Sequence, residues 1–275
     1  MSLTRGVTGP VTRPLTRAIT AAGSGGSAGF SPLSLFASGE QGAWLDPSDF
    51  SVMWQDAART MLVTAVGQPV GAINDKSGRA NHATQATAAA RPILRVDGNG
   101  FHYLEFDGVD DSLSTAAINF TATDKLTVFT GLRKVSDATT AVVYELSAAS
   151  GVGTFALFSP QNSGATDYGL RSQGSLLSSI ITAGFAAPIT SVITQRGDIA
   201  ADINILRVNA AQVGSSVTDQ GTGNYGNHQL FIGRRGGASL PFTGRIYQLI
   251  VRGATSTAGQ IADAETFVNG KTGAY

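Results

Sequence analysis

The sequence has no cysteine among its 275 residues, which excludes disulfide bonds and thiolate metal sites. It is also poor in charge, since only 14% of its residues are charged against about 25% in an average protein. The 19 basic and 19 acidic side chains cancel, so no overall field attracts nucleic acid or a membrane surface. No run of about 18 apolar residues predicts a transmembrane helix. We therefore expect neither nucleic acid nor a membrane as a partner.

Residues suited to acid–base or metal chemistry are few. The four glutamates are dispersed along the chain, at Glu40, Glu105, Glu145 and Glu265. A glycosidase needs two carboxylates that flank the scissile bond. Glu105 and Asp107 share the parity of one strand, but the Asp107–Gly108 pair indicates a turn and a structural role. The three histidines, His82, His102 and His228, lack the spacing of metal ligands. The sequence predicts a protein that is not an enzyme, with no catalytic residue and no cofactor.

Hydrophobic residues make up 42% of the chain and glycine occurs 34 times, which favours a β-rich fold with a substantial core and many turns. Short segments that alternate polar residues with Val, Ile, Phe or Tyr are typical of strands. They lie at 71–74, 103–106, 126–134, 141–146, 154–158, 168–171, 191–196, 203–208, 229–233 and 244–252. Strands at this spacing indicate an all-β fold, either a two-sheet antiparallel sandwich or a barrel.

One short helix is expected near the end of the chain. Thr257 and Gln260 form a capping-box pattern at its start. An apolar stripe at helical spacing follows, made of Ala258, Ile261, Ala264 and Val268. Gly270 is placed to end the helix, because glycine adopts the left-handed conformation that closes many helices.

Residues 1–41 are predicted to form an extended N-terminal arm with a Gly/Ser linker, ahead of a domain at 42–275. The arm contains three triplets of an apolar residue, Thr and Arg, and Pro10 and Pro14 prevent a continuous helix. One interpretation is a disordered tail. The other is an arm that anchors on a partner protein through Leu3, Arg5, Val11, Arg13, Leu15 and Arg17. The arm lacks the apolar segment of a signal peptide, so we expect assembly in the cytoplasm.

Four segments carry a resemblance to a known family. They are GAWLDPSD at 42–49, DKSGRANHA at 75–83, LEFDGVDD at 104–111, and the pair LFIG at 230–233 and FTGRIYQLIV at 242–251. Together they resemble the concanavalin A-like, laminin-G-like jelly rolls, in particular those of bacteriophage virion proteins. The resemblance implies a two-sheet jelly-roll sandwich over residues 42–272. Hydrolases of this fold carry a dense Glu-x-Asp-x-x-Glu pattern, which this sequence lacks.

The sequence departs from the family pattern in two places. Arg79–Ala80 and Asn209–Ala210 each stand where Asn-Gly is usual. A tight type I′ turn needs positive φ at both central residues, which alanine adopts reluctantly. We therefore expect the hairpin at Asn209–Ala210 to depart from that turn type.

Two groups of residues are candidates for binding. Asp107, Asp110 and Asp111 offer hard oxygen ligands to Ca²⁺, which some laminin-G-like domains bind. We favour the alternative that these carboxylates accept backbone N–H bonds in a turn. The loops around 166–171, 224–228 and 234–235 mix aromatic, amide and charged groups, as sugar sites do. The predicted glycan-binding residues are Tyr168, Arg171, Asn224, Tyr225, His228, Arg234 and Arg235.

The first functional hypothesis is a non-enzymatic bacteriophage virion structural protein, assembled in the host cytoplasm and anchored by its arm to other virion proteins. Its jelly roll would be displayed as a tail or head fibre or as a capsid decoration, as a homo-oligomer and in contact with host surface glycans. The second hypothesis is a carbohydrate-binding lectin module that acts mainly in recognition. The third, less favoured, is a polysaccharide hydrolase or lyase.

Overall fold

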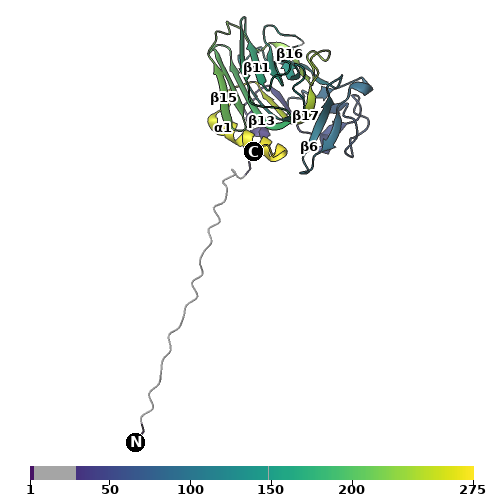
Figure 1. The fold of residues 1–275 in the computed structure, drawn as a ribbon, viewed down its shortest axis with the longest axis vertical. Helices are drawn as coiled ribbons and strands as arrows, with labels where there is room; N and C mark the ends of the chain where they lie inside the picture. Colours follow the sequence, from purple (N-terminus) through teal and green to yellow (C-terminus); the bar gives the residue numbers. More distant parts are fainter. Residues whose placement is uncertain (3–28, 148) are drawn as a thin grey trace.

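The structure is a computed structural model that describes residues 1–2, 29–147 and 149–275. Two antiparallel sheets pack face to face, and one short helix lies near the end of the chain (Figure 1). The predicted all-β, two-sheet antiparallel sandwich is therefore confirmed. The predicted arm residues Leu3, Arg5, Val11, Arg13, Leu15 and Arg17 lie outside the described residues.

The first sheet has eight strands. Its order is β15 (Ala211–Ser216), β14 (Ile203–Val208), β13 (Ile189–Asp198), β8 (Lys125–Lys134), β17 (Thr243–Arg252), β6 (His102–Asp107) and β5 (Ile93–Val96), and β1 (Gly42–Leu45) also pairs with β17. The longest strands, β8, β13 and β17, lie at its centre, where β-branched and aromatic residues pack on both faces. This sheet carries five of the ten strands that the sequence predicted.

The second sheet has nine strands. Its order is β12 (Leu177–Thr182), β11 (Tyr168–Gln173), β10 (Phe155–Phe158), β9 (Val142–Leu146), β16 (Asn227–Ile232), β7 (Leu113–Asn119), β4 (Ala83–Thr84), β3 (Ala72–Ile73) and β2 (Met53–Trp54). All five residues of β9 and all four of β10 are buried. Both faces of the sheet are therefore covered at these two strands.

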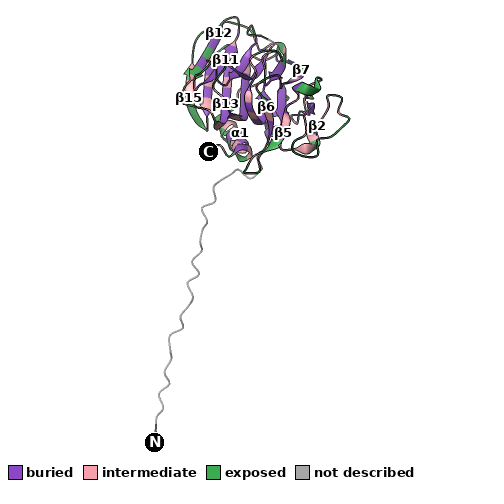
Figure 2. Ribbon diagram, turned by 45° about the vertical axis from the view of Figure 1, so that its right-hand side comes forward, coloured by how far each residue is buried: buried purple, intermediate pink, exposed green. Residues whose placement is uncertain are grey.

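The main core lies between the two sheets, where the ribbon is buried in Figure 2. Polar side chains also join the sheets across this core. The hydroxyl of Tyr168 on β11 donates to Ser191 Oγ on β13 at 3.0 Å, and the hydroxyl of Tyr144 on β9 donates to Gln195 on β13. These bonds satisfy tyrosines that have no exposed surface.

Helix α1 (Ala258–Thr272) covers part of the outer side of the eight-stranded sheet. Its Ala264 and Val268 pack on Phe129, Val192 and Ile250, and Ile261 is partly buried beside them. The predicted apolar stripe is therefore confirmed except for Ala258, which is exposed. Thr257 and Gln260 form the predicted capping box. The predicted end at Gly270 is wrong, because the helix continues for almost one more turn and closes at Gly273 in the left-handed conformation. Within the described residues, no helix is long and apolar enough to span a membrane.

Residues 30–41 pack on the domain. The short 3-10 helix η1 (Pro32–Phe36) buries Leu35 and Phe36 against the cluster under α1. Phe30 makes an edge-to-face contact with Phe267, with ring centroids 6.1 Å apart. Glu40 forms an ion pair with Arg252, with a guanidinium nitrogen 2.7 Å from Glu40 Oε1. The sequence assigned this stretch to the arm, and the structure joins it to the sandwich.

The DKSGRANHA segment is a scaffold. The carboxylate of Asp75 accepts hydrogen bonds from the backbone N–H groups of Trp44, Ser77 and Asn81 at 2.7–3.0 Å, and His82 Nδ1 accepts from the N–H of Asp75. The motif thereby ties strand β1 to the loop after β3. His82 has a lowered pKa because burial disfavours its charged form.

The Asn209–Ala210 hairpin corrects one expectation. Both residues have positive φ, 49° and 62°, as a type I′ turn requires. Asn209 Oδ1 accepts a 2.8 Å bond from the N–H of Val192, which holds the turn against the neighbouring strand β13. The tight turn therefore forms with alanine at its second position.

The 3-10 helices η2 (Phe50–Val52) and η3 (Ala88–Ala90) complete the elements.

Candidate functional site

One row of residues crosses the nine-stranded sheet in register. Arg171 on β11 lies opposite Ala156 on β10, which lies opposite Glu145 on β9, and the row continues through Phe231 on β16 to Ser114 on β7. Because partners in register point to the same side of a sheet, these side chains share one face. Their chain neighbours Leu170 and Leu146 belong to the core. We call the opposite side, which carries the row, the outer face.

A loop folds over part of the outer face. Residues 233–240 bring Leu240 against Val142, Ala156 and Phe158, which form a small apolar cluster. The N–H of Val142 donates to the carbonyl of Leu240 at 3.0 Å, which fixes the loop. Phe158 is thereby 1% exposed although it lies on the outer face.

Glu145 and Arg235 form a bidentate ion pair on the outer face. Arg235 Nε and its second guanidinium nitrogen donate to the two carboxylate oxygens at 2.7 and 2.9 Å. The Glu145 side chain has no exposed surface, and the Arg235 side chain is 20% exposed. The Arg235 guanidinium also lies 5.4 Å from the ring centroid of Phe158. This pair uses the whole hydrogen-bonding edge of the carboxylate.

Arg171 is the second cation on this face. Its guanidinium carbon lies 4.6 Å from the Phe158 ring centroid, so two guanidinium groups share one aromatic ring. Among the described residues, Arg171 has no hydrogen-bond or ion-pair partner, and its Nε is buried. Burial and the neighbouring Arg235 lower the pKa of Arg171, because both disfavour the charged form. The charge of Glu145 opposes this in part, so the outer face carries a half-buried positive charge that no described side chain pairs with directly.

An open cavity of about 430 Å³ lies on the same sheet, beside Phe231. It is lined by Ala117, Ser147, Asn227, His228, Gln229 and Phe231. Phe231 is three strands away from Arg171 in the register row, which corresponds to about 14 Å at ordinary strand spacing. The cavity and Arg171 could therefore contact one extended ligand that crosses the strands.

The predicted glycan residues divide into three groups: side chains on the outer face, side chains that fix loops, and side chains of the core. Arg171 and Arg235 meet over Phe158, and His228 lines the cavity. Asn224 and Arg234 serve loops: Asn224 Oδ1 accepts from the N–H of Gly226, and Arg234 donates to the carbonyls of Asp110 and Ala238.

Tyr168 and Tyr225 are wrong as stacking residues, because both are fully buried and their hydroxyls bond to Ser191 and Ser172. Aromatic rings in loops favoured a sugar site in the sequence, but here they complete the core. Phe158 and Glu145 were missed as members of the site. Nothing in the sequence distinguishes Phe158 from a core phenylalanine.

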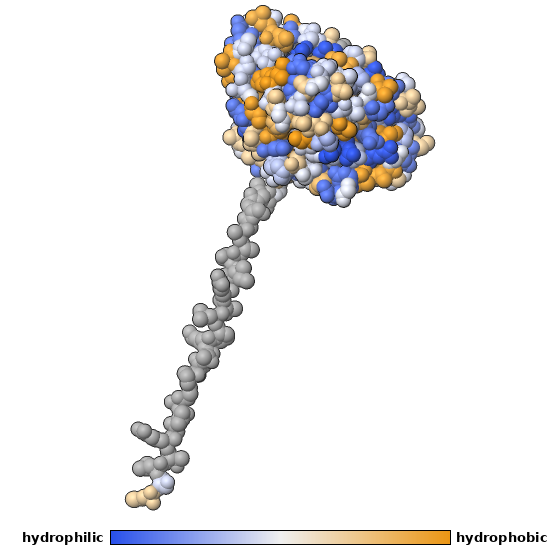
Figure 3. Space-filling model, viewed as in Figure 1, coloured by the Kyte–Doolittle hydropathy of each residue, from blue (hydrophilic) through white to orange (hydrophobic). Residues whose placement is uncertain are grey.

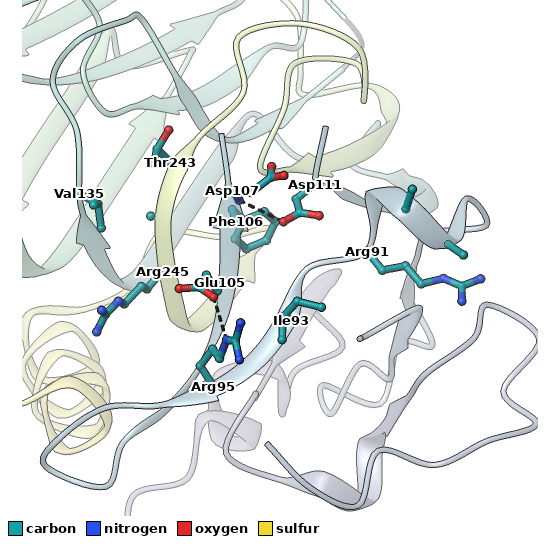
Figure 4. A pocket seen from close by; sticks show the side chains of 13 residues that line it. Arg91, Ile93, Arg95, Glu105, Phe106, Asp107, Asp111, Val135, Thr243 and Arg245 are labelled. Carbon is teal, nitrogen blue, oxygen red and sulfur yellow. Dashed lines mark hydrogen bonds and ion pairs between the residues drawn. The ribbon is translucent and has the colours of Figure 1, made fainter. Parts of the chain in front are cut away.

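A second cavity, of about 510 Å³, lies on the outer side of the eight-stranded sheet (Figure 4). Glu105 and Asp107 both line it from β6, so their predicted common side is confirmed. Arg95 pairs with Glu105 at 2.8 Å, and both side chains are well exposed. Arg91, on its rim, donates to three backbone carbonyls and is held by them. We call this cavity the acidic pocket.

Asp107, Asp110 and Asp111 lie at one end of the acidic pocket. Their nearest carboxylate oxygens are within 4.8 Å of one another, a spacing that a metal ion could bridge. The carboxylates also accept backbone bonds in the turn: Asp107 from the N–H of Val109 at 2.8 Å, and Asp111 from the N–H of Asp107 at 3.0 Å. Burial, and then the charges of Asp107 and Asp110, raise the pKa of Asp111 to about 7.

Each of the four glutamates is held by an arginine. Glu40 pairs with Arg252, Glu105 with Arg95, Glu145 with Arg235 and Glu265 with Arg207, at 2.7–2.8 Å. These contacts hold all four carboxylates in ion pairs within the fold.

Comparisons with known proteins agree on the fold. No family model matches the chain, and no curated protein matches it. Its structure is similar to the binding domain of Paraclostridial Mosquitocidal Protein 1, with a TM-score of 0.54 and 14% identity over 72% of this chain and 49% of that one.

Two further similar structures come from botulinum neurotoxins. One is type C, described as depending on two ganglioside molecules for cell entry (TM-score 0.55, 9% identity, 83% and 51% of the two chains). The other is the type DC binding domain in complex with SialylT (0.52, 9%, 73% and 49%). The chain spans about half the length of these neighbours, and at this identity the likeness shows the β-sandwich fold alone.

Proposed function

We propose that the chain is a non-catalytic carbohydrate-binding module whose site is the outer face of the nine-stranded sheet. The observation that carries the proposal is the half-buried guanidinium of Arg171, which has no partner among the described residues and lies on the same face as an open polar cavity. Sugar sites combine an apolar platform with a few fixed polar groups, and this face has both. The toxin neighbours described with gangliosides and SialylT are consistent with this class of function.

Two cavity-filling variants of the full chain test where the ligand binds. Ala117→Trp places a large ring in the cavity of the outer face, and Ala89→Trp does the same in the acidic pocket, and both alanines are exposed. A glycan array identifies a ligand, and titration calorimetry then compares the variants. We expect Ala117→Trp to weaken binding at least about 10-fold, or 1.4 kcal/mol, and Ala89→Trp to leave it unchanged.

The reverse result would move the site to the acidic pocket. Absence of binding to every glycan on an array of bacterial and animal sugars would contradict the proposal. The non-catalytic part is tested separately, by incubating the protein with bacterial surface polysaccharides. Release of reducing ends would overturn it.

The finer proposal is that this module belongs to a bacteriophage virion, as a fibre or capsid decoration. It is supported by the apolar-Thr-Arg triplets of residues 3–17 and by the jelly-roll segments of the sequence. In this role the arm anchors the module to other virion proteins during assembly in the host cytoplasm, as a homo-oligomer. Deleting residues 2–22 should abolish incorporation into particles and leave the thermal unfolding of the domain unchanged. Normal incorporation of the shortened chain would contradict the anchoring role.

A further inference from the structure

The charge balance of the outer face is uneven. Two arginines share the ring of Phe158, and one carboxylate, Glu145, lies in the same register row. Arg235 occupies both oxygens of that carboxylate. The pair is internally neutral, and neither Arg171 nor Arg234 of the covering loop has an ion-pair partner among the described residues, so the face carries net positive charge. A partly desolvated cation without a counter-ion favours binding of an anion.

The guanidinium of Arg171 is also oriented. Its guanidinium carbon lies over the Phe158 ring, 4.6 Å from the centroid, and this contact holds the group against the sheet. A planar guanidinium edge matches the two oxygens of a carboxylate and forms a bidentate pair with it.

An unsatisfied acceptor lies beside this donor. Gly169 is two residues before Arg171 on β11 and is paired in register with Phe158. Its missing side chain leaves room for Gln161, whose carboxamide oxygen would overlap a Cβ placed on Gly169. That oxygen is buried and has no hydrogen-bond partner among the described residues. The site thus offers an anion-binding edge and, next to it, an acceptor for a hydroxyl or amide N–H.

The neighbouring edge strand supplies apolar surface. Ser179 on β12 pairs with Arg171, and Leu177 and Ile181 lie two positions to either side of it on the same face. They are 43% and 48% exposed. Such side chains can cover the non-polar face of a sugar ring while its carboxylate reaches Arg171.

We propose that the outer face recognises an acidic saccharide, whose carboxylate pairs with Arg171 and whose hydroxyl or amide N–H donates to Gln161 Oε1. This inference rests on the proposed function and names its ligand class: a uronic or sialic acid residue. The carboxylate completes the charge balance of the face, and the sugar donor satisfies the buried oxygen.

The test uses the full chain and matched polymers. Titration calorimetry compares oligogalacturonate and oligosialic acid with the same oligomers after reduction of their carboxyl groups to alcohols. We expect the acidic form of at least one polymer to bind at least about 10-fold more tightly than its reduced form. Arg171→Gln should remove that difference and the salt dependence of binding, and Gln161→Leu should weaken binding with the salt dependence kept. The control is Arg95→Gln, which removes an arginine from the acidic pocket. It should change neither the preference for the acidic oligomer nor the salt dependence of binding.

The outcomes separate the two proposals. Equal binding of acidic and reduced oligomers at the face blocked by Ala117→Trp overturns the acidic ligand and leaves the carbohydrate-binding function in place. Tighter binding of a sulfated neutral oligomer than of the carboxylated one, lost in Arg171→Gln, also overturns the carboxylate assignment. If neither acidic polymer binds, the inference is overturned whatever the glycan array shows. Thermal unfolding of each variant confirms that it is folded.

Discussion

The outer sides of the two sheets differ in the charged group that lacks an oppositely charged partner. On the nine-stranded sheet, Arg171 is a half-buried cation, and the carboxylate of Glu145 near it already forms a bidentate pair with Arg235. In the acidic pocket, Asp111 is a buried carboxyl whose nearest charges are two further aspartates. The pocket side of the surface, near β6, is strongly hydrophilic, whereas apolar patches gather at the upper left over the edge strands (Figure 3). A chain with zero net charge thus places an arginine without an ion-pair partner among the described residues on one sheet and a cluster of aspartates beside the other.

A carboxyl and a guanidinium group respond differently when their charge is buried. The carboxyl can take up a proton near neutral pH, and burial raises its pKa toward 7. An arginine cannot lose its proton in a protein, so Arg171 stays charged and needs a counter-ion from outside. The carboxyl cluster therefore predicts a dependence on pH, and the arginine predicts a ligand.

The largest expected effect comes from breaking the ion pair on the nine-stranded sheet. Arg235→Ala leaves the carboxylate of Glu145 buried without its partner, and we expect a loss of about 3–5 kcal/mol in the free energy of unfolding. Arg95→Ala breaks the exposed pair with Glu105 and should cost less than about 1 kcal/mol. Urea denaturation of both variants measures the contrast. Equal losses would show that the two faces do not differ in burial as described.

A double variant sharpens this result. Glu145→Gln combined with Arg235→Met removes both charges and keeps the side-chain volumes similar. It should recover most of the stability that Arg235→Ala loses, because no buried charge is left unpaired.

The second effect is the pH dependence caused by Asp111. Its folded pKa of about 7 lies above the ordinary value of 3.8, so the folded state binds this proton more tightly than the unfolded state. The free energy of unfolding should therefore fall as pH rises from about 4 to about 7, and level off above that. Asp111→Asn should remove this fall and stabilise the protein at pH 8 by about 1–2 kcal/mol, the solvent nearby reducing the full effect.

Denaturation curves of the wild type and Asp111→Asn at pH 5 and pH 8 measure the difference. Asp202→Asn, at a half-buried turn between β13 and β14, is the control. A wild type that is more stable at pH 8 than Asp111→Asn would contradict the assigned pKa.

The smallest effect concerns calcium. The carboxylates of Asp107 and Asp111 already accept backbone N–H bonds in the turn, so we expect 1 mM Ca²⁺ to shift the melting temperature by less than about 1 °C, from the mass-action relation with weak affinity. Scanning calorimetry with and without EDTA measures this. A rise of several degrees in the melting temperature that Asp110→Asn abolishes would show that the acidic pocket binds Ca²⁺. The pH dependence assigned to Asp111 would then not be expected.

Much of the fold was predictable because local patterns carry it. The alternation in 126–134, 191–196 and 244–252 predicts the three central strands, and Thr257 with Gln260 predicts the start of the helix. The strands at 113–119, 177–182 and 211–216 were missed, since they are rich in Ser, Ala or Gly and two of them are sheet edges. Their pairing partners, rather than their own composition, make them strands.

The candidate site was predictable only in part. The sequence brought Arg171, Arg235 and His228 into consideration, but it also proposed Tyr168 and Tyr225, which are core residues. A residue's face depends on the register of its strand, and a shift by one position would exchange buried and exposed sides. The bulge between Leu157 and Phe158 is one such local shift that no sequence rule predicted.

The amino-acid sequence by itself determined the class of the molecule: an all-β sandwich with a terminal helix, no disulfide and few glutamates. These features depend on composition and on periodicities of a few residues. Only the tertiary structure decided that Glu145 is neutralised by Arg235, 90 positions away, and that Arg171 is left without a partner. Charge pairing depends on distances between strands that are remote in the chain, and only the folded register sets those distances.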